Sequence, residues 1–308
     1  MNISFYIPTF NRPSILQQSI SSLVNNTTIK PDEVWIIDDG SDINIRKGLL
    51  QLNTENGVNL ILHAKNMGIG YSFERIYNLM RQNDKLDIAC IVESDYIWRK
   101  GWLEDCLAVF ESSPYTIAIA GTDHPDMYNR FKTHTTFPSI MNECFGKDLE
   151  SREYLYKPFD LETKLGNIKV QGVSNSCGCM IIHWKRLKEI LNLLDLEQDF
   201  WKRMDRAFNK GITHDTRKNA SDGHMSSTIS NYGEQYLKSL QQDLSKNFPM
   251  LSICDYSISL HVCGGGENGK IVGEGETFVI SPKWDDKYLD INPRSVYQEN
   301  FHIHKTIN

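Results

Sequence analysis

Short apolar runs that end abruptly in polar residues alternate with segments of helical periodicity along the first 120 residues. The apolar runs read as buried strands, at residues 2–8, 33–38, 59–63, 87–92 and 116–120. Between them, apolar residues spaced three and four apart predict helices at residues 13–25, 43–52, 69–81 and 101–110. This alternation of strand and helix predicts an α/β fold with a doubly wound, mostly parallel central sheet and flanking helices.

The pattern becomes less regular after residue 121. Residues 121–172 mix polar and aromatic side chains and predict a long excursion with a hairpin or a short helix. Beyond it the sequence predicts strands at 177–183 and 257–261, helices at 184–194, 199–209 and 232–245, and a loop over the site at 210–231. Residues 264–275 carry six glycines without the strand-to-helix order of a phosphate-binding loop, so we expect a tail or lid there.

Length and charge narrow the function classes. A chain of 308 residues can bury a sizeable core as one large domain. Its net charge of -6 and pI near 5.9 give no overall basic field for a nucleic acid backbone. No apolar stretch approaches the roughly 18 residues of a membrane span, and no secretory signal opens the chain. We therefore expect a cytoplasmic protein.

The seven cysteines support the same compartment. Their number is odd and they are scattered, which predicts reduced thiols. Cys177 and Cys179 form a CGC segment that lacks the spacing and the second pair of a zinc site. A buried strand thiol is the simpler interpretation of that segment.

An acidic triplet follows the fourth apolar run. Glu93, Ser94 and Asp95 end the strand CIV, and residues two apart in an extended chain face the same side. Both carboxylates can therefore reach one hard divalent cation, for which Mg²⁺ and Mn²⁺ are the candidates. Solvated loops also contain such triplets, so the position after a buried strand is what favours a metal site.

A second acidic pair ends the second apolar run. Asp38 and Asp39 are followed by Gly40 and Ser41. A carboxylate here could accept the imide N–H of a base or bind a ribose hydroxyl. Asp and Ser also cap helices, and both roles can coexist in different residues of the segment.

Together these segments resemble a GT-A glycosyltransferase of family 2. The matching pieces are IPTFNRP at the start, VWIIDDGS, the element at residues 66–68, and VESD with the later Gly101, Trp102 and Leu103, all in order over about 105 residues. The resemblance implies a nucleotide-sugar site, with Asp39 on the base and the acidic triplet on the ribose and the metal. The implied donor-contacting residues are Pro8, Thr9, Asn11, Arg12, Asp39, Asn66, Gly68, Glu93, Ser94 and Asp95.

The chain also departs from the family pattern. Glu93 stands where Asp is more usual, so Asp95 is the safer metal ligand. The usual Arg-Asn pair after the Asn66 element is replaced by Phe73 and Glu74, and Arg75 is a possible substitute.

The resemblance is weaker in the second half of the chain. The segment at residues 198–211 resembles the family's acidic helix start, which implies Asp199 as the base that deprotonates the acceptor, with Asp205 as the rival. His261 follows a strand and could complete the metal site with Glu93 and Asp95, although a lone His is more often structural. Four tryptophans offer a sugar-stacking face or a core, at positions 98, 102, 184 and 201.

The resulting prediction is a metal-dependent glycosyltransferase that uses Mn²⁺ or Mg²⁺ and a nucleotide sugar, with UDP-sugar favoured, and inverts the anomeric carbon. We expect one domain with a nucleotide-sugar half at 1–121, an acceptor and catalytic half at 122–263, and a tail or lid at 264–308. The acceptor is expected to be a glycan, while a small molecule or a hydroxylated DNA base stays open. The DNA alternative is suggested by five basic residues in the central excursion, at Lys147, Arg152, Lys157, Lys164 and Lys169.

Two other function classes stay open. A nucleotidyltransferase would share an acidic metal site, but TFNRPS is a poor match to its basic Gly-rich loop. A catalytically silent nucleotide- or sugar-binding module would bind UDP without turning over a donor.

Overall fold

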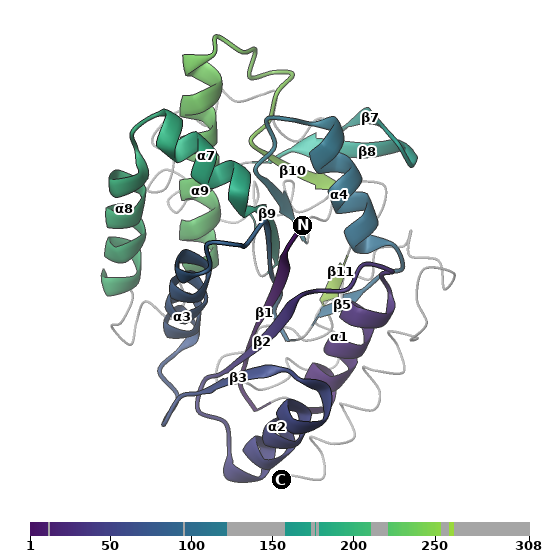
Figure 1. The fold of residues 1–308 in the computed structure, drawn as a ribbon, viewed down its shortest axis with the longest axis vertical. Helices are drawn as coiled ribbons and strands as arrows, with labels where there is room; N and C mark the ends of the chain where they lie inside the picture. Colours follow the sequence, from purple (N-terminus) through teal and green to yellow (C-terminus); the bar gives the residue numbers. More distant parts are fainter. Residues whose placement is uncertain are drawn as a thin grey trace, which may run out of the picture.

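The computed structural model has three layers, with a central sheet between two groups of helices (Figure 1). It describes residues 1–11, 13–94, 96–121, 158–173, 176, 179–210, 221–253 and 259–261. Two of the predicted regions lie outside this part of the chain, namely most of the central excursion and the glycine-rich tail at 264–308. Within the described residues, no helix has the length and apolar character needed to cross a membrane.

The first half alternates between strands and helices as its pattern predicts. The elements are β1 Ile3–Thr9, α1 Pro13–Asn25, β2 Glu33–Asp38, α2 Ile43–Asn56, β3 Asn59–Leu62, α3 Ile69–Gln82, β4 Ile88–Ile91, β5 Tyr96–Trp98, α4 Trp102–Ser112 and β6 Ala118–Ala120. The short strand β5 was not predicted, because three residues carry no periodicity.

The second half contains a hairpin, three helices and further strands. The elements are β7 Phe159–Thr163, β8 Gly166–Gly172, β9 Met180–His183, α7 Trp184–Leu193, α8 Glu197–Lys210, α9 Ser221–Ser239, β10 Met250–Ile253 and β11 Ser259–His261. The hairpin β7–β8 realises one of the two predicted forms of the excursion.

Nine strands form the main sheet in the order β3-β2-β1-β4-β9-β6-β10-β8-β7. Among these described strands, β8 and β9 run against the other seven. The predicted mostly parallel α/β fold is confirmed. The two reversed strands lie outside the parallel block β3-β2-β1-β4, so the carboxyl ends of those four strands share one edge, called here the carboxyl edge.

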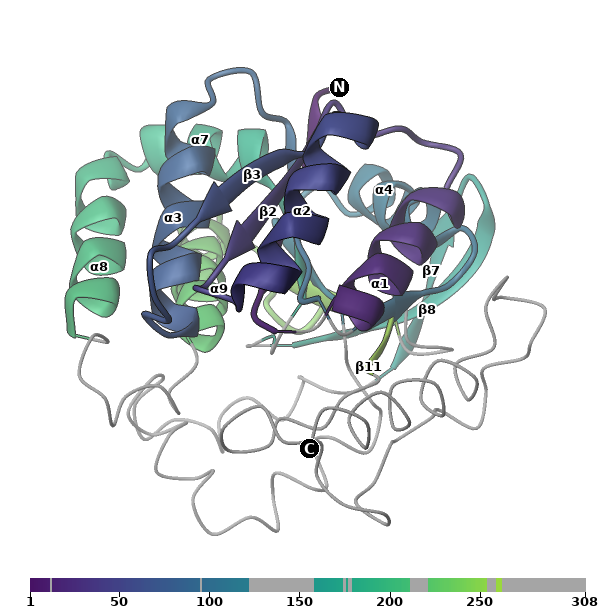
Figure 2. The same cartoon turned by 90° about the horizontal axis from the view of Figure 1, so that it is seen from below.

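Each face of the sheet buries its own core. Because side chains alternate along a strand, Phe5 faces one cluster with α1, α2 and α4, whereas Tyr6 faces the other with α3, α7, α8 and α9. The two helix groups lie on opposite sides of β2 and β3 in Figure 2. Cys90, Cys106 and Cys179 are buried in these layers and form no disulfide, and burial raises the pKa of the Cys90 and Cys106 thiols.

The predicted loop at 210–231 is wrong for its second part, because α9 begins at Ser221 and ends at Ser239. The small residues Ser226 and Ser230 from the expected loop are buried in α9, and further along the helix Gly233 lies so near β10 that a Cβ atom would be 2.3 Å from Cβ of Pro249. The predicted helix at 232–245 therefore starts earlier and ends earlier than the sequence indicates. The remaining residues of the expected loop, 211–220, lie outside the described part.

Candidate nucleotide-sugar site

The carboxyl edge brings the ends of β1, β2 and β4 together. Thr9 pairs with Asp38 in the parallel register of β1 and β2, and the N–H of Asp39 donates to the carbonyl of Thr9 at 2.9 Å. On the other side of β1, the N–H of Val92 donates to the carbonyl of Tyr6, also at 2.9 Å. The polar residues that follow these three strands are thus held beside one another by main-chain bonds.

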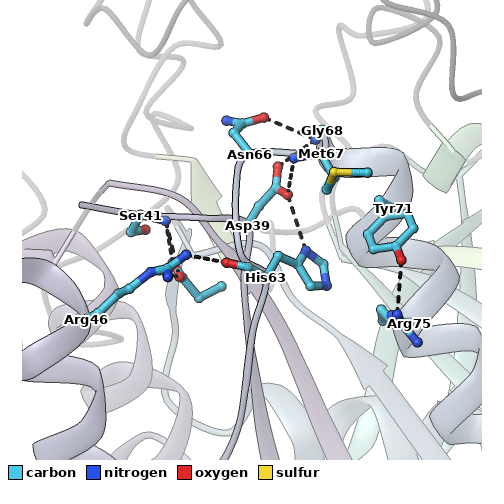
Figure 3. A network of polar contacts seen from close by, with 10 residues as sticks. Asp39, Ser41, Arg46, His63, Asn66, Met67, Gly68, Tyr71 and Arg75 are labelled. Atoms are coloured by element: carbon cyan, nitrogen blue, oxygen red, sulfur yellow. Dashed lines mark hydrogen bonds and ion pairs between the residues drawn. The ribbon is translucent and has the colours of Figure 1, made fainter. Parts of the chain in front are cut away.

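Asp39 lies at the centre of a polar cluster at this edge (Figure 3). Its side chain is buried, and its Oδ1 and Oδ2 atoms accept the N–H groups of Met67 and Gly68, each at 2.8 Å. Nδ1 of His63 lies 3.3 Å from the same Oδ1 atom. An ionised carboxylate offers about four acceptor positions, so among the described residues one position on Oδ2 has no partner and suits a ligand.

Asp38 has a separate set of partners. It is fully buried, accepts the N–H of Ser41 at 3.1 Å and lies 3.2 Å from Nε of Arg46 on α2. The same Arg46 donates to the carbonyl of His63. Asp38 therefore serves the turn and the helix that follows, whereas Asp39 faces the element at residues 66–68. The two roles that the sequence left open are divided between the two residues.

Asn11 and Asn66 fix the loops around the acidic pair. Asn11 adopts a left-handed φ of 51°, its N–H donates to Oγ of Ser41 at 2.8 Å, and its Oδ1 accepts the N–H of Asp42 at 2.9 Å. Oδ1 of Asn66 accepts the N–H of Gly68 at 3.1 Å. The predicted contact residues at these positions therefore lie at the same edge as Asp39. Arg12 lies outside the described residues.

The acidic triplet follows β4 at the carboxyl edge. Glu93 is half-buried, and its N–H donates to Sγ of Cys179 at 3.4 Å, while Ser94 is buried. Asp95 and the side chain of His261 lie outside the description. The backbone still places His261 opposite Tyr96 in the antiparallel pair of β11 and β5, although 165 positions separate the two in sequence.

These positions suit a divalent cation. Carboxylate oxygens and one imidazole form an acceptable donor set for Mn²⁺ and, through the oxygens, for Mg²⁺. The described residues contain no complete group of three His, Cys, Asp or Glu ligands. Among the described positions, Glu93 and the backbone of His261 are the ones that fit such a site.

A junction between β4, β6 and α9 was not predicted. The carbonyl of Cys179 accepts the N–H of Gly121 at 2.8 Å and the hydroxyl of Ser176 at 2.6 Å. Ser226 on α9 accepts the N–H of Ser176 at 3.1 Å. The run of small residues around the CGC segment was its only signal in the sequence. Through it, the first half of α9 is fixed beside the carboxyl edge.

Asp199 lies away from this edge. It is exposed in the first turn of α8 and accepts the hydroxyl of Tyr232 at 2.5 Å. Tyr232 precedes Gly233, which packs on Ile117 and Pro249, and those two residues directly precede β6 and β10. Because β6 and β10 run in the same direction as β1, the residues that precede them mark the amino ends of the strands. Asp199 therefore lies near these amino ends, and the structure does not bring it together with Asp39 and Glu93.

Asp205 lies six residues further along α8, about 9 Å along the helix axis at 1.5 Å per residue. Its side chain lies outside the description. The helix is the outermost element beside α3 and α9 in Figure 1.

The aromatic and basic candidates have other partners. Trp98, Trp102, Trp184 and Trp201 are all buried in the two cores, so they are packing residues. Lys164 pairs with Glu111 at 2.7 Å and Lys169 with Asp160 at 3.1 Å. The other basic residues of the excursion, at 147, 152 and 157, lie outside the described part.

Comparisons with solved structures return glycosyltransferases with low overlap. A mannosyltransferase from Pyrobaculum calidifontis, solved with GDP-Man and Mn²⁺, is 13% identical with a TM-score of 0.41 and covers 63% of this chain and 46% of its own. Glucosyl-3-phosphoglycerate synthase from Mycobacterium tuberculosis, solved with Mn²⁺, UDP and phosphoglyceric acid, is 13% identical with a TM-score of 0.38 over 60% of this chain and 56% of its own.

Sequence comparisons are more informative. A chondroitin synthase from Pasteurella multocida (strain Pm70) is 28% identical over 130 residues, which are 42% of this chain and 13% of that protein. The chain thus spans a small part of this relative. The model of glycosyl transferase family 2 matches residues 4–189, which run from β1 into α7. The match contains Asp39 and Glu93 but neither α9 nor His261. The chain therefore belongs to glycosyl transferase family 2, as the order of its polar strand ends predicts.

Proposed function

We propose that this chain transfers a sugar from a nucleotide-sugar donor, preferably a UDP-sugar, to an acceptor hydroxyl in a reaction that requires Mn²⁺ or Mg²⁺. The observation that carries the proposal is the buried Asp39 carboxylate at the carboxyl edge, with one acceptor position left on Oδ2. In open α/β sheets this edge is where ligands bind. Membership of glycosyl transferase family 2 supports the reaction class.

The Asp39 carboxylate favours particular bases. Its remaining acceptor position suits the imide N–H of uracil or thymine, and also the N–H groups of guanine. Cytosine presents a lone pair on N3, which a carboxylate repels. We therefore rank UDP and dTDP first, GDP next and CDP last. Thr9, at the end of β1, and Asn11, in the loop that follows, lie at the same carboxyl edge as Asp39.

The acidic triplet is proposed to hold the cation and the diphosphate. Glu93, Asp95 and His261 are the proposed ligands, supported by the half-buried place of Glu93 and by the β11–β5 register. When bound, the cation stabilises the negative charge that develops on the departing diphosphate. The protein's part is to hold these carboxylates beside the nucleotide pocket before the donor arrives.

A glycan is the proposed acceptor, supported by the segment shared with a chondroitin synthase. The described basic residues give no support to a DNA acceptor, because Lys164 and Lys169 are paired with acids. The family resemblance implies Asp199 as the base, with Asp205 as its rival six residues further on, and we take Asp205 as the proposed base. Inversion is proposed from the resemblance. Asp199 is less suited to that role, because it lies at the opposite edge of the sheet.

A panel of UDP, dTDP, GDP and CDP, each with and without Mn²⁺, tests the donor class by thermal unfolding, since a ligand that binds only the native state raises its stability. We expect a Mn²⁺-dependent increase with UDP. No increase with any nucleotide would overturn the proposal. An increase with UDP but no turnover of UDP-sugars would identify a silent binding module instead.

Matched variants test the metal step. Glu93→Gln is expected to lower donor turnover at least tenfold, about 1.4 kcal/mol in the barrier, while leaving the fold intact. Glu111→Gln is the control, because this exposed carboxylate pairs only with Lys164 among the described contacts. Full activity of the wild-type chain in excess chelator would refute the metal requirement.

A further inference from the structure

We propose that His63 is a positioning residue for base recognition, which holds the Asp39 carboxylate so that one lone pair of Oδ2 faces the nucleotide. The proposal rests on the proposed function and adds a residue to it. The family resemblance implies no role for this position.

Both the backbone and the ring of His63 have defined contacts. Its N–H donates to the carbonyl of Asp38 at 2.9 Å, and its carbonyl accepts from the guanidinium of Arg46. The ring packs edge-on against Tyr71, with centroids 4.9 Å apart. The side chain is 5% exposed. Backbone and ring are therefore held in place before any ligand binds, which is what a positioning role requires.

The contact with Asp39 defines the tautomer. Nδ1 lies 3.3 Å from Oδ1 of a carboxylate that already accepts two backbone N–H groups. A lone pair on Nδ1 would face a lone pair on that oxygen, so the geometry requires a proton on Nδ1. Nε2 of His63 is buried and has no partner in the described part of the chain.

A half-satisfied buried imidazole is costly for packing alone. Leaving Nε2 buried without a hydrogen bond is unfavourable, and an apolar residue of similar size would avoid that cost. The interaction that an apolar residue could not supply is the one from Nδ1 to Asp39. This contact is therefore the function that we assign to the ring.

The two carboxylate oxygens of Asp39 have different partners, and this explains how the His63 contact orients the carboxylate. Within the part of the chain that the structure describes, Oδ1 accepts from Met67 and from His63, whereas Oδ2 accepts from Gly68 alone. His63 thus completes Oδ1 and opposes rotation of the carboxylate about its Cβ–Cγ bond. The unused lone pair of Oδ2 is the one available to the N–H of a base.

Two substitutions separate positioning from packing. His63→Leu removes the donor and keeps a buried side chain, and is expected to weaken UDP binding about tenfold, as for the loss of a hydrogen bond to a charged group. His63→Asn keeps an N–H donor near the place of Nδ1 and is expected to restore affinity to within about threefold. KM for the donor should follow these changes while kcat stays constant, because the base is remote from the reacting carbon.

His183→Asn is the matched control. This histidine lies at the start of α7, at the opposite edge of the sheet, where its Nδ1 accepts the N–H of Arg186 at 3.3 Å. An unchanged affinity for UDP is expected. Equal UDP affinity of wild type and His63→Leu would overturn the positioning role while leaving the donor proposal intact. Absence of nucleotide binding by the wild type would instead overturn the donor proposal and this inference together.

The tautomer is tested without any variant. Long-range ¹H–¹⁵N correlation spectra of the wild-type chain, with His63 assigned by comparison with His63→Asn, are expected to report a protonated Nδ1. A proton on Nε2 alone, with bare Nδ1 against Asp39, would overturn the proposal even if His63→Leu fails to fold.

Discussion

The adjacent carboxylates Asp38 and Asp39 allow one chemical change to be tested at two neighbouring positions. Asn in place of Asp39 keeps one oxygen and replaces the other by an NH₂ group. The oxygen is expected to stay towards Met67 and His63. The NH₂ group then opposes the N–H of Gly68, which keeps only the weaker bond from Oδ1 of Asn66 at 3.1 Å. One charge-assisted hydrogen bond is lost.

That loss is expected to cost about 1.5–3 kcal/mol of unfolding free energy, the usual contribution of a hydrogen bond to a charged group. Asp38→Asn keeps an oxygen for the N–H of Ser41 but leaves Arg46 without its carboxylate. Removing one partner of a buried ion pair costs about 3–5 kcal/mol. Because the Arg46 side chain is 19% exposed and still donates to a carbonyl, we expect about 2–4 kcal/mol.

Thermal unfolding with and without UDP and Mn²⁺ measures both effects. At about 2–4 °C per kcal/mol for a chain of this size, Asp39→Asn should unfold roughly 3–12 °C and Asp38→Asn roughly 4–16 °C below the wild type. Only Asp39→Asn should lose the increase in Tm on adding nucleotide. The reasoning is refuted if Asp39→Asn unfolds at the wild-type temperature, or if Asp38→Asn loses the nucleotide response to the same extent.

Three further substitutions test the surroundings of the site. Gly40→Ala places a Cβ atom 2.3 Å from the backbone nitrogen of Asn66 at a φ of +82°, and is expected to cost about 2–4 kcal/mol by clash and strain, measured as a lower Tm. Ser226→Ala leaves the N–H and carbonyl of Ser176 without their partner and should cost about 2 kcal/mol in urea unfolding; an unchanged midpoint would contradict this. Burial and the nearby guanidinium of Arg186 lower the pKa of His183 to about 4. As the pH drops from 6.5 towards 4, the unfolded state therefore binds the proton first, and the free energy of unfolding should fall. His183→Asn should flatten that slope in pH-dependent melting curves.

The first half of the fold was predictable because each helix and strand is indicated by the pattern of apolar and polar residues within its own segment of the sequence. A buried strand such as β2 is a short apolar run bounded by polar residues, and it was predicted at its observed bounds. Polar residues that end parallel strands must share one edge, which is why Asp39 and Glu93 both lie at the carboxyl edge. This argument needs only the alternation of elements and the direction of the chain.

The contacts that shape the site depend on register, which the sequence does not record. His63 meets Asp39 because Leu62 pairs with Asp38 in the β2–β3 ladder, although 24 positions separate the two residues. A histidine directly after the third apolar run was the available signal. Likewise, the serines in the first half of α9 read as loop residues, because Ser226 has its partner in Ser176, 50 positions away in sequence.

The position of Asp199 gives a last test, because the resemblance and the structure point to different roles. In the structure, the carboxylate of Asp199 accepts a hydrogen bond from the hydroxyl of buried Tyr232. Asp199→Ala should therefore lower the free energy of unfolding by about 1 kcal/mol, the usual net contribution of one hydrogen bond.

Tyr232→Phe is the matched control for Asp199→Ala. It removes the same hydrogen bond and keeps the carboxylate. If Asp199 is structural, both variants should transfer sugar at the wild-type rate once assayed well below their Tm. If Asp199→Ala alone loses transfer by two or more orders of magnitude, as expected for removal of a general base, then α8 must approach the acceptor during the reaction. In that case the amino edge of the sheet, and not only the carboxyl edge, would take part in the chemistry.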